Sequence, residues 1–154
     1  MSCRIMSCAL VAALISTTAG ADCFERPDRI SILLGSEHVN ATTDYTEFNP
    51  GVFLSWDCES IILTAGVYTN SFGDASPSAL VSYPIIETND GSLAAFAGAS
   101  YFPDVEGLDL GYSGNVVPLM GMQLNYKNTF VQVLPGVEDS FDLLITAGLR
   151  FHLN

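Results

Sequence analysis

The chain has 154 residues, with 5 lysines and arginines against 17 aspartates and glutamates, and a formal net charge of -12. This length fits one domain. The scarcity of cations excludes nucleic acid as a partner, because phosphates have to be neutralised by Lys or Arg. Hydrophobic residues make up 49% of the chain and charged residues only 14%, whereas soluble domains average about 25% charged residues. This composition excludes a disordered acidic chain and indicates that part of the surface faces something other than water.

Residues 1–21 have the pattern of a secretory signal peptide. Arg4 precedes an apolar run over 5–15, and Ala19-Gly20-Ala21 gives the small-x-small pattern that a signal peptidase accepts. We expect cleavage after Ala21, which leaves 22–154 as the mature domain. A membrane anchor is the alternative, but the apolar run is shorter than the roughly 20 residues needed to span a bilayer.

Two of the four cysteines, Cys23 and Cys58, remain in the mature chain. In an exported protein such a pair is expected to form a disulfide. A zinc site is not favoured, because the two histidines, His38 and His152, are widely separated. The sequence therefore indicates neither a metal nor a cofactor.

The mature domain reads as all-β. Apolar residues alternate with period two between turn residues, and no segment has sustained apolar spacing at three and four residues. The expected strands cover 30–35, 51–56, 61–68, 79–86, 92–101, 115–126, 129–134 and 143–153.

The connections between these strands alternate between long and short. The connections 39–50, 71–78, 102–114 and 135–140 are long, and 58–60, 87–91 and 127–128 are short. This alternation is typical of an eight-stranded antiparallel up-and-down transmembrane β-barrel in the outer membrane, with tight turns in the periplasm and longer loops outside. Closure would also pair every backbone group in lipid. A soluble lipocalin-like barrel or a sandwich is the alternative.

The barrel topology agrees with the cysteine positions. Cys58 lies in a short turn and Cys23 precedes the first strand, so both fall on the periplasmic rim, where oxidation is permitted. A disulfide there would tie the start of the barrel to its second turn.

The inner faces are expected to hold aromatic and small residues with few charges. An eight-stranded barrel either packs its interior with side chains or holds one slender ligand such as an acyl chain, and both alternatives stay open. The residues in question are Phe53, Ile62, Gly66, Tyr68, Phe96 and Gly98.

Three prolines interrupt the strand pattern: Pro50, Pro118 and Pro135. Proline removes a donor from the hydrogen-bond ladder. The resulting gaps in strand pairing are either lateral entrances for lipid or the ordinary ends of strands.

Polar side chains gather on the predicted outer rim. His38 ends the first strand, and Ser71, Asp74 and Ser76 lie in the second long connection. A histidine near a serine and an aspartate can act as a general base on a hydroxyl, although a loop histidine is more often a surface residue. Strict alternation places His38 on the outward face with Ile32, unless a bulge or the strand end re-aims it.

From His38 onward the chain resembles the PagP-type lipid A palmitoyltransferases. The segment 45–51 (Tyr-Thr-Glu-Phe-Asn-Pro-Gly) is similar to the family's Tyr-Asn-Glu-x-Pro segment, and 67–74 looks like its strand leading into a Phe-x-Asp-Ser loop. The sites around Pro118 and Pro135 match its later proline sites at compatible spacing. The chain departs from the family at Ala75, where the family has its serine.

The resemblance implies a monomeric outer-membrane enzyme that moves an acyl chain from a phospholipid to the lipid A of lipopolysaccharide. His38 would be the base, Asp74 would orient or stabilise it, and Ser76 or Ser71 would supply a hydroxyl, with loop backbone N–H groups as an oxyanion contact. Pro50, Pro118 and Pro135 would mark the lateral openings. The alternatives are a catalytically inactive barrel, a lipid A deacylase-like hydrolase and a soluble periplasmic barrel.

Overall fold

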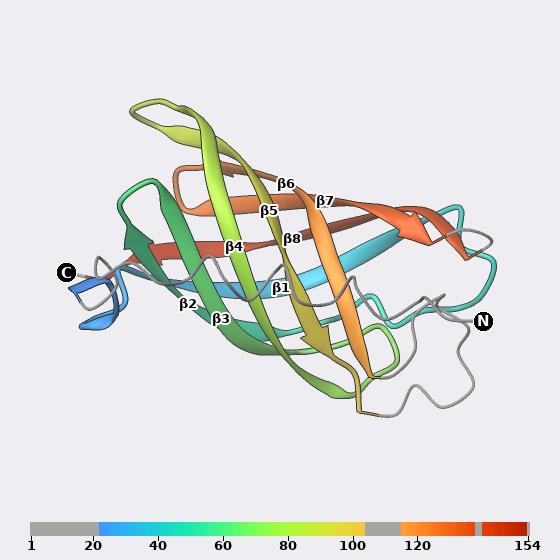
Figure 1. Ribbon diagram of the computed structural model, residues 1–154. Coiled ribbons are helices and arrows are strands. Elements are labelled where there is room, and N and C mark those ends of the chain that lie inside the picture. Colours follow the sequence, from blue (N-terminus) through green and yellow to red (C-terminus); the bar gives the residue numbers. More distant parts are fainter. Residues whose placement is uncertain (1–21, 104–114, 138–139, 154) are drawn as a thin grey trace, which may run out of the picture.

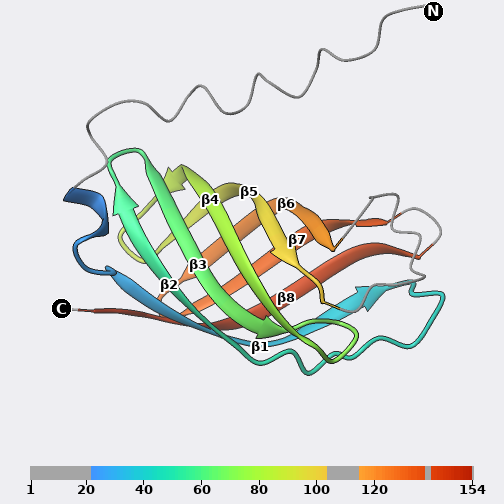
Figure 2. The same ribbon diagram turned by 60° about the horizontal axis from the view of Figure 1, so that its bottom comes forward.

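The structure is a closed antiparallel β-barrel. It is a computed structural model that describes residues 22–103, 115–137 and 140–153, so the expected signal peptide lies outside the described residues. Each strand pairs with the next in sequence, and the last pairs with the first (Figures 1 and 2). The predicted eight-stranded barrel is therefore confirmed. The elements are a 3-10 helix, η1 (Asp22–Phe24), followed by β1 (Arg29–Val39), β2 (Gly51–Cys58), β3 (Ile61–Thr69), β4 (Ala75–Glu87), β5 (Gly91–Tyr101), β6 (Val116–Tyr126), β7 (Thr129–Val137) and β8 (Phe141–His152).

The two ends of the barrel differ. One end, called the turn end here, carries η1 and the tight connections β2–β3, β4–β5 and β6–β7, on the left in Figure 1. Glu59 and Lys127 adopt positive φ of 53° and 52° in two of these turns, as tight hairpins require. The opposite end, called the loop end, carries the longer connections. No helix within the described ranges is long and apolar enough to cross a membrane.

Four strands extend by two or more residues beyond their predicted limits at the loop end. β1 continues to Val39 and β7 continues through Pro135 to Val137, while β4 begins at Ala75 and β8 at Phe141. At the start of β4, the inward positions are the buried serines Ser76 and Ser78. Polar inward residues hide the alternation on which the sequence prediction depends.

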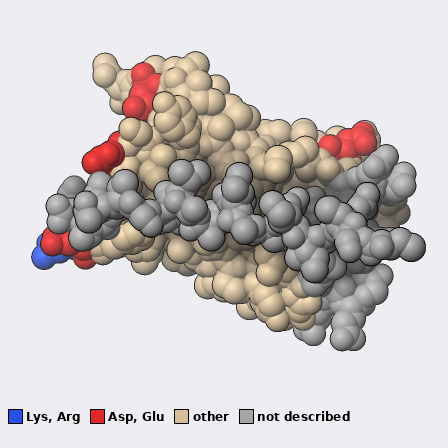
Figure 3. Space-filling model, viewed as in Figure 1, with Lys and Arg blue, Asp and Glu red and all other residues tan. Residues whose placement is uncertain are grey.

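The outward face of the barrel is apolar and exposed. β3, β5, β6 and β7 contain no charged residue. On the face seen in Figure 3, the acidic and basic side chains lie toward the two ends of the molecule. Exposed apolar surface of this extent is unusual for a protein surrounded by water. Exposed outward side chains of the strands include Val52, Val67, Val81, Tyr83, Ile85, Val116, Met120 and Leu124.

The inward face is polar at the turn end, where a chain of side-chain hydrogen bonds crosses four strands. Thr146 Oγ1 donates to Gln132 Oε1 at 3.1 Å, and Gln132 Nε2 donates to Gln123 Oε1 at 2.8 Å. Gln123 Nε2 donates to Asn125 Oδ1 at 2.7 Å, and Asn125 Nδ2 donates to Ser92 Oγ at 3.0 Å. These mutual bonds satisfy amides that would otherwise be costly to bury. The sequence pattern predicts mainly aromatic and small residues on the inward face, and this chain of hydrogen-bonded side chains was not predicted.

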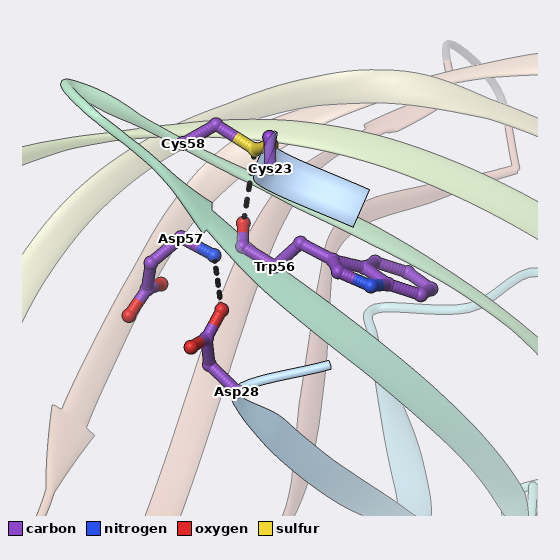
Figure 4. Close-up of a disulfide and its surroundings, with 5 residues drawn as sticks. All are labelled: Cys23, Asp28, Trp56, Asp57 and Cys58. Carbon is purple, nitrogen blue, oxygen red and sulfur yellow. Dashed lines mark hydrogen bonds between the residues drawn. A yellow bond between two sulfur atoms is a disulfide. The ribbon is translucent and has the colours of Figure 1, made fainter. Parts of the chain in front are cut away.

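A disulfide closes the turn end, as the cysteine count predicted. Cys23 and Cys58 are bonded, with Cα atoms 5.3 Å apart, within the usual range. Figure 4 shows the bond beside η1, with Trp56 nearby. The ring of Phe24, the last residue of η1, packs on that of Trp56 at 5.8 Å between centroids. The backbone N–H of Asp57 donates to Asp28 Oδ2 at 2.7 Å, which fixes the start of β1 against β2.

Candidate functional site

A bulge in β1 turns His38 into the barrel. Leu33 pairs with Gly148 and Gly35 pairs with Ala147, so Leu34 has no partner on β8. One extra residue reverses the inside–outside alternation. Leu33 is buried before the bulge and His38 is buried after it, with only 6% of its surface exposed. The outward orientation expected from strict alternation is therefore wrong, and the bulge is the physical reason.

His38 lies against a serine and two aromatic rings. Its Nε2 is 3.0 Å from Ser71 Oγ. The imidazole stacks on Tyr45 at 4.2 Å between centroids, and Phe141 meets it edge-on at 4.9 Å. These contacts fix both the position and the plane of the ring.

The His38–Ser71 distance lies in the range of a base and its nucleophile. When Nε2 accepts the serine proton, Nδ1 carries the other hydrogen. Among the described residues, Nδ1 has no hydrogen-bond partner. The pair thus has the base and the hydroxyl of a nucleophilic site, without a carboxylate hydrogen-bonded behind the histidine.

Asn70 organises the loop that carries Ser71. Its side chain is 1% exposed, and its Nδ2 donates to Ser76 Oγ at 2.9 Å. Its Oδ1 accepts from the backbone N–H groups of Phe72 at 2.9 Å and Asp74 at 3.0 Å. The structure therefore brings Ser71 to His38, whereas Ser76 is fully buried against Asn70. Loop backbone N–H groups were expected to contact an oxyanion, and two N–H groups of this loop, those of Phe72 and Asp74, are already bonded to Asn70.

A second buried asparagine joins β1 to this loop. Asn49 Nδ2 donates to the Asn70 carbonyl at 3.1 Å, and Ser36 Oγ donates to Asn49 Oδ1. The next residue, Pro50, accepts at its carbonyl from the Thr69 N–H at 2.9 Å. The sequence placed Asn49 and Asn70 among the polar residues of the predicted outer rim but gave them no chemical role. In the sequence, each of the two is a polar residue next to a strand end, and such residues are common in turns of every kind.

His38 and Ser71 line a cavity of about 200 Å³ at the loop end. Most of its other lining side chains are apolar or aromatic. An apolar cavity of about 150 Å³ is large enough to hold benzene, so this cavity has room for a segment of hydrocarbon. The lining includes Leu33, Tyr45, Phe72, Phe102, Leu119, Leu134, Phe141 and Leu144.

The wall beside this cavity is open between β6 and β7. Their pairing extends from Tyr126–Thr129 to Met122–Val133 and stops there. Beyond that point the two strands separate toward the loop end (Figure 1). Pro118 on β6 and Pro135 on β7 lie in the unpaired parts, and both line the cavity. Proline cannot donate a hydrogen bond to a neighbouring strand. Both prolines therefore fit the part of the wall where β6 and β7 do not pair with each other, although each strand still pairs with its other neighbour.

No protein-family model matches the chain, and no curated protein matches it. The resemblance to the palmitoyltransferases stays a prediction. Within the described ranges, no group of three or more His, Cys, Asp or Glu side chains is arranged to hold a metal ion.

Proposed function

We propose that the protein is an outer-membrane barrel whose turn end faces the periplasm. The charge-free strands and the apolar outward face support a barrel wall that faces lipid. The disulfide at the turn end fits an oxidising compartment. The loop end, with His38 and Ser71, would then lie at the outer leaflet, where lipid A is found.

We further propose that the site transfers or hydrolyses acyl chains of membrane lipids. The observation that carries this proposal is the His38–Ser71 pair, 3.0 Å apart, at an apolar cavity. A lipid acyl chain would enter sideways through the gap at Pro118 and Pro135 and lie along the cavity. Pro50 lies on the opposite side of the site, where its carbonyl is bonded to β3, and it is the weaker candidate for an entrance.

The reaction would proceed through an acyl-serine. The Ser71 oxygen attacks the ester carbonyl of a phospholipid as its proton passes to His38 Nε2. The ester C–O bond breaks, and the lysophospholipid leaves with that proton. A hydroxyl of lipid A, or water, then gives a proton to His38 and attacks the acyl group. The acyl–serine C–O bond breaks, and the proton passes from His38 to the Ser71 oxygen, which restores both groups. Acceptance by lipid A is acyl transfer, and acceptance by water is hydrolysis.

The test uses phospholipid with a labelled acyl chain, lipid A and the purified protein in detergent. We expect His38→Ala and Ser71→Ala to lower release of lysophospholipid at least 100-fold, the low end for loss of acid–base catalysis. His152→Ala is the matched control, because His152 lies exposed at the turn end, and it should retain activity. Full activity in His38→Ala would refute the mechanism.

A catalytically silent lipid-binding barrel is the second candidate. The observation in its favour is that His38 Nδ1 has no carboxylate partner among the described residues. The same assay separates the two, since this barrel would bind labelled lipid without forming labelled lipid A or free fatty acid. Labelled fatty acid without labelled lipid A would indicate the hydrolase.

A further inference from the structure

The turn end of the barrel encloses a second cavity, of about 100 Å³, with a cationic lining. Arg29 and Arg150 both line it, and none of its described lining residues is an aspartate or glutamate. This volume equals that of about three waters in the liquid. Many of its other lining side chains are apolar, and six lining residues are shared with the first cavity, so it reaches from the turn end toward the middle of the barrel. The cavity is thus small, with its positive charge at the turn end.

Arg29 is buried with unused donors. Only 7% of its surface is exposed. Its Nη2 pairs with the carboxylate of Asp57, whose side chain is 43% exposed. Its Nε and Nη1 are buried and have no hydrogen-bond partner among the described residues. A buried charged group with unmade hydrogen bonds is costly to keep.

Arg150 adds a second positive charge on the same inward face. It pairs in register with Ser31 on β1, two residues along from Arg29, and the two guanidinium groups repel each other. Asp57 is the carboxylate that attracts both. One half-exposed carboxylate shared by two guanidinium groups leaves a positive charge to be neutralised.

We propose that this cavity binds a small phosphate-type oxyanion between Arg29 and Arg150. Guanidinium groups donate charge-assisted hydrogen bonds to phosphate oxygens. Arg29 Nε and Nη1 have no partner among the described residues and lie on different edges of the guanidinium plane, so each can donate one such bond. Hydroxyls of Ser31, Ser55 and Thr64 also line the cavity. Ser55 and Thr64 are hydrogen-bonded to each other at 2.9 Å, so one of these two and Ser31 can donate to the remaining oxygens. This site lies at the opposite end of the barrel from His38 and does not depend on the acyl-transfer proposal. The anion is either a free ion or the phosphate of a lipid head group.

The test is calorimetric titration of the refolded protein in an uncharged detergent, at constant ionic strength set with chloride. Inorganic phosphate and a short-chain phosphatidate are titrated separately. Saturable binding of phosphate alone identifies a free ion, and binding of phosphatidate alone identifies a lipid head group. Saturation by neither overturns the proposal.

Three variants locate the bound anion. We expect Arg150→Gln to weaken binding at least tenfold and Asp57→Asn, which removes the competing carboxylate, to strengthen it severalfold. Lys127→Gln is the control, because it removes an exposed cation from a turn at the same end, and it should not change the affinity. Equal losses in Lys127→Gln and Arg150→Gln would show diffuse attraction and overturn the site. If Arg150→Gln does not fold, weaker binding in Asp57→Asn overturns it independently.

Discussion

Val81→Arg tests whether the barrel wall faces hydrocarbon. Val81 is the middle residue of β4, points outward and is 40% exposed. Ile86 is 54% exposed and lies near the turn end of the same strand. The β5 partners of Val81 and Ile86 are Ala97 and Leu93, four residues apart, because β4 has a register shift between Pro84 and Ile86. Four residues at about 3.3 Å each, on a strand tilted by about 40°, separate the two side chains by about 10 Å along the barrel axis. An apolar band is about 25 Å tall, so Ile86 falls near its edge when Val81 lies at its centre.

We expect Val81→Arg to lower the free energy of unfolding by about 2–4 kcal/mol, and Ile86→Arg by about 0–1 kcal/mol, because the cost of an arginine depends on its depth in lipid. The assay is urea unfolding of the protein in lipid vesicles, followed by the fluorescence of Trp56, the one tryptophan in the chain. In water, both substitutions at exposed positions would stay within about 0.5 kcal/mol of the wild type. Equal effects at the two positions, or a larger loss at Ile86, would refute the membrane orientation.

Three further predictions use the same unfolding assay. Asn70→Ala removes three side-chain hydrogen bonds and should cost about 3 kcal/mol at about 1 kcal/mol each, whereas Asn89→Ala in an exposed turn should cost little; similar losses would contradict the role given to Asn70. Gly148→Ala would bring a methyl group to 2.6 Å from the Phe130 ring and 2.2 Å from a β1 carbonyl, which should cost about 1–3 kcal/mol, and an unchanged midpoint would contradict the packing. Replacing Cys23 and Cys58 by serine opens a link across a sequence separation of 35 residues and should cost about 4 kcal/mol in the chain-entropy account; reducing agent should then have no further effect, and a reduction-sensitive double variant would contradict the assignment.

The sequence was sufficient to predict the barrel because its evidence is repetitive. Alternation recurs in eight segments, and the connections alternate in length, so an error in any one segment does not change the topology. The limits of the strands were less predictable. β4 and β7 run further than expected, because buried serines and a proline carry no apolar signal.

The candidate site was predictable in its residue types but not in its contacts. Ser71 and Ser76 both follow β3 closely, and nothing in their spacing says that Ser71 faces His38 while Ser76 is bonded to Asn70. Which serine faces His38 depends on the hydrogen bonds of the buried Asn70 amide, and these bonds cannot be read from the spacing of residues in the sequence. The hydrogen bond between Gln123 and Gln132 was missed for a similar reason. Two polar residues on neighbouring strands can be recognised as partners only when the register of the strands is known.

The unpaired Leu34 divides β1 into two stretches. Odd-numbered residues point into the barrel before Leu34, and even-numbered residues point into it afterwards. Deleting this one residue would leave the turn-end stretch in place and swing His38 out of the interior toward the surroundings of the barrel. Conversely, the turn-end stretch can exchange one outward side chain for another without disturbing the histidine beyond the bulge. The turn-end stretch of β1 can thus vary with the barrel wall while the other stretch keeps His38 in place, and a change of one residue in the length of β1 would exchange the inward and outward side chains at the loop end.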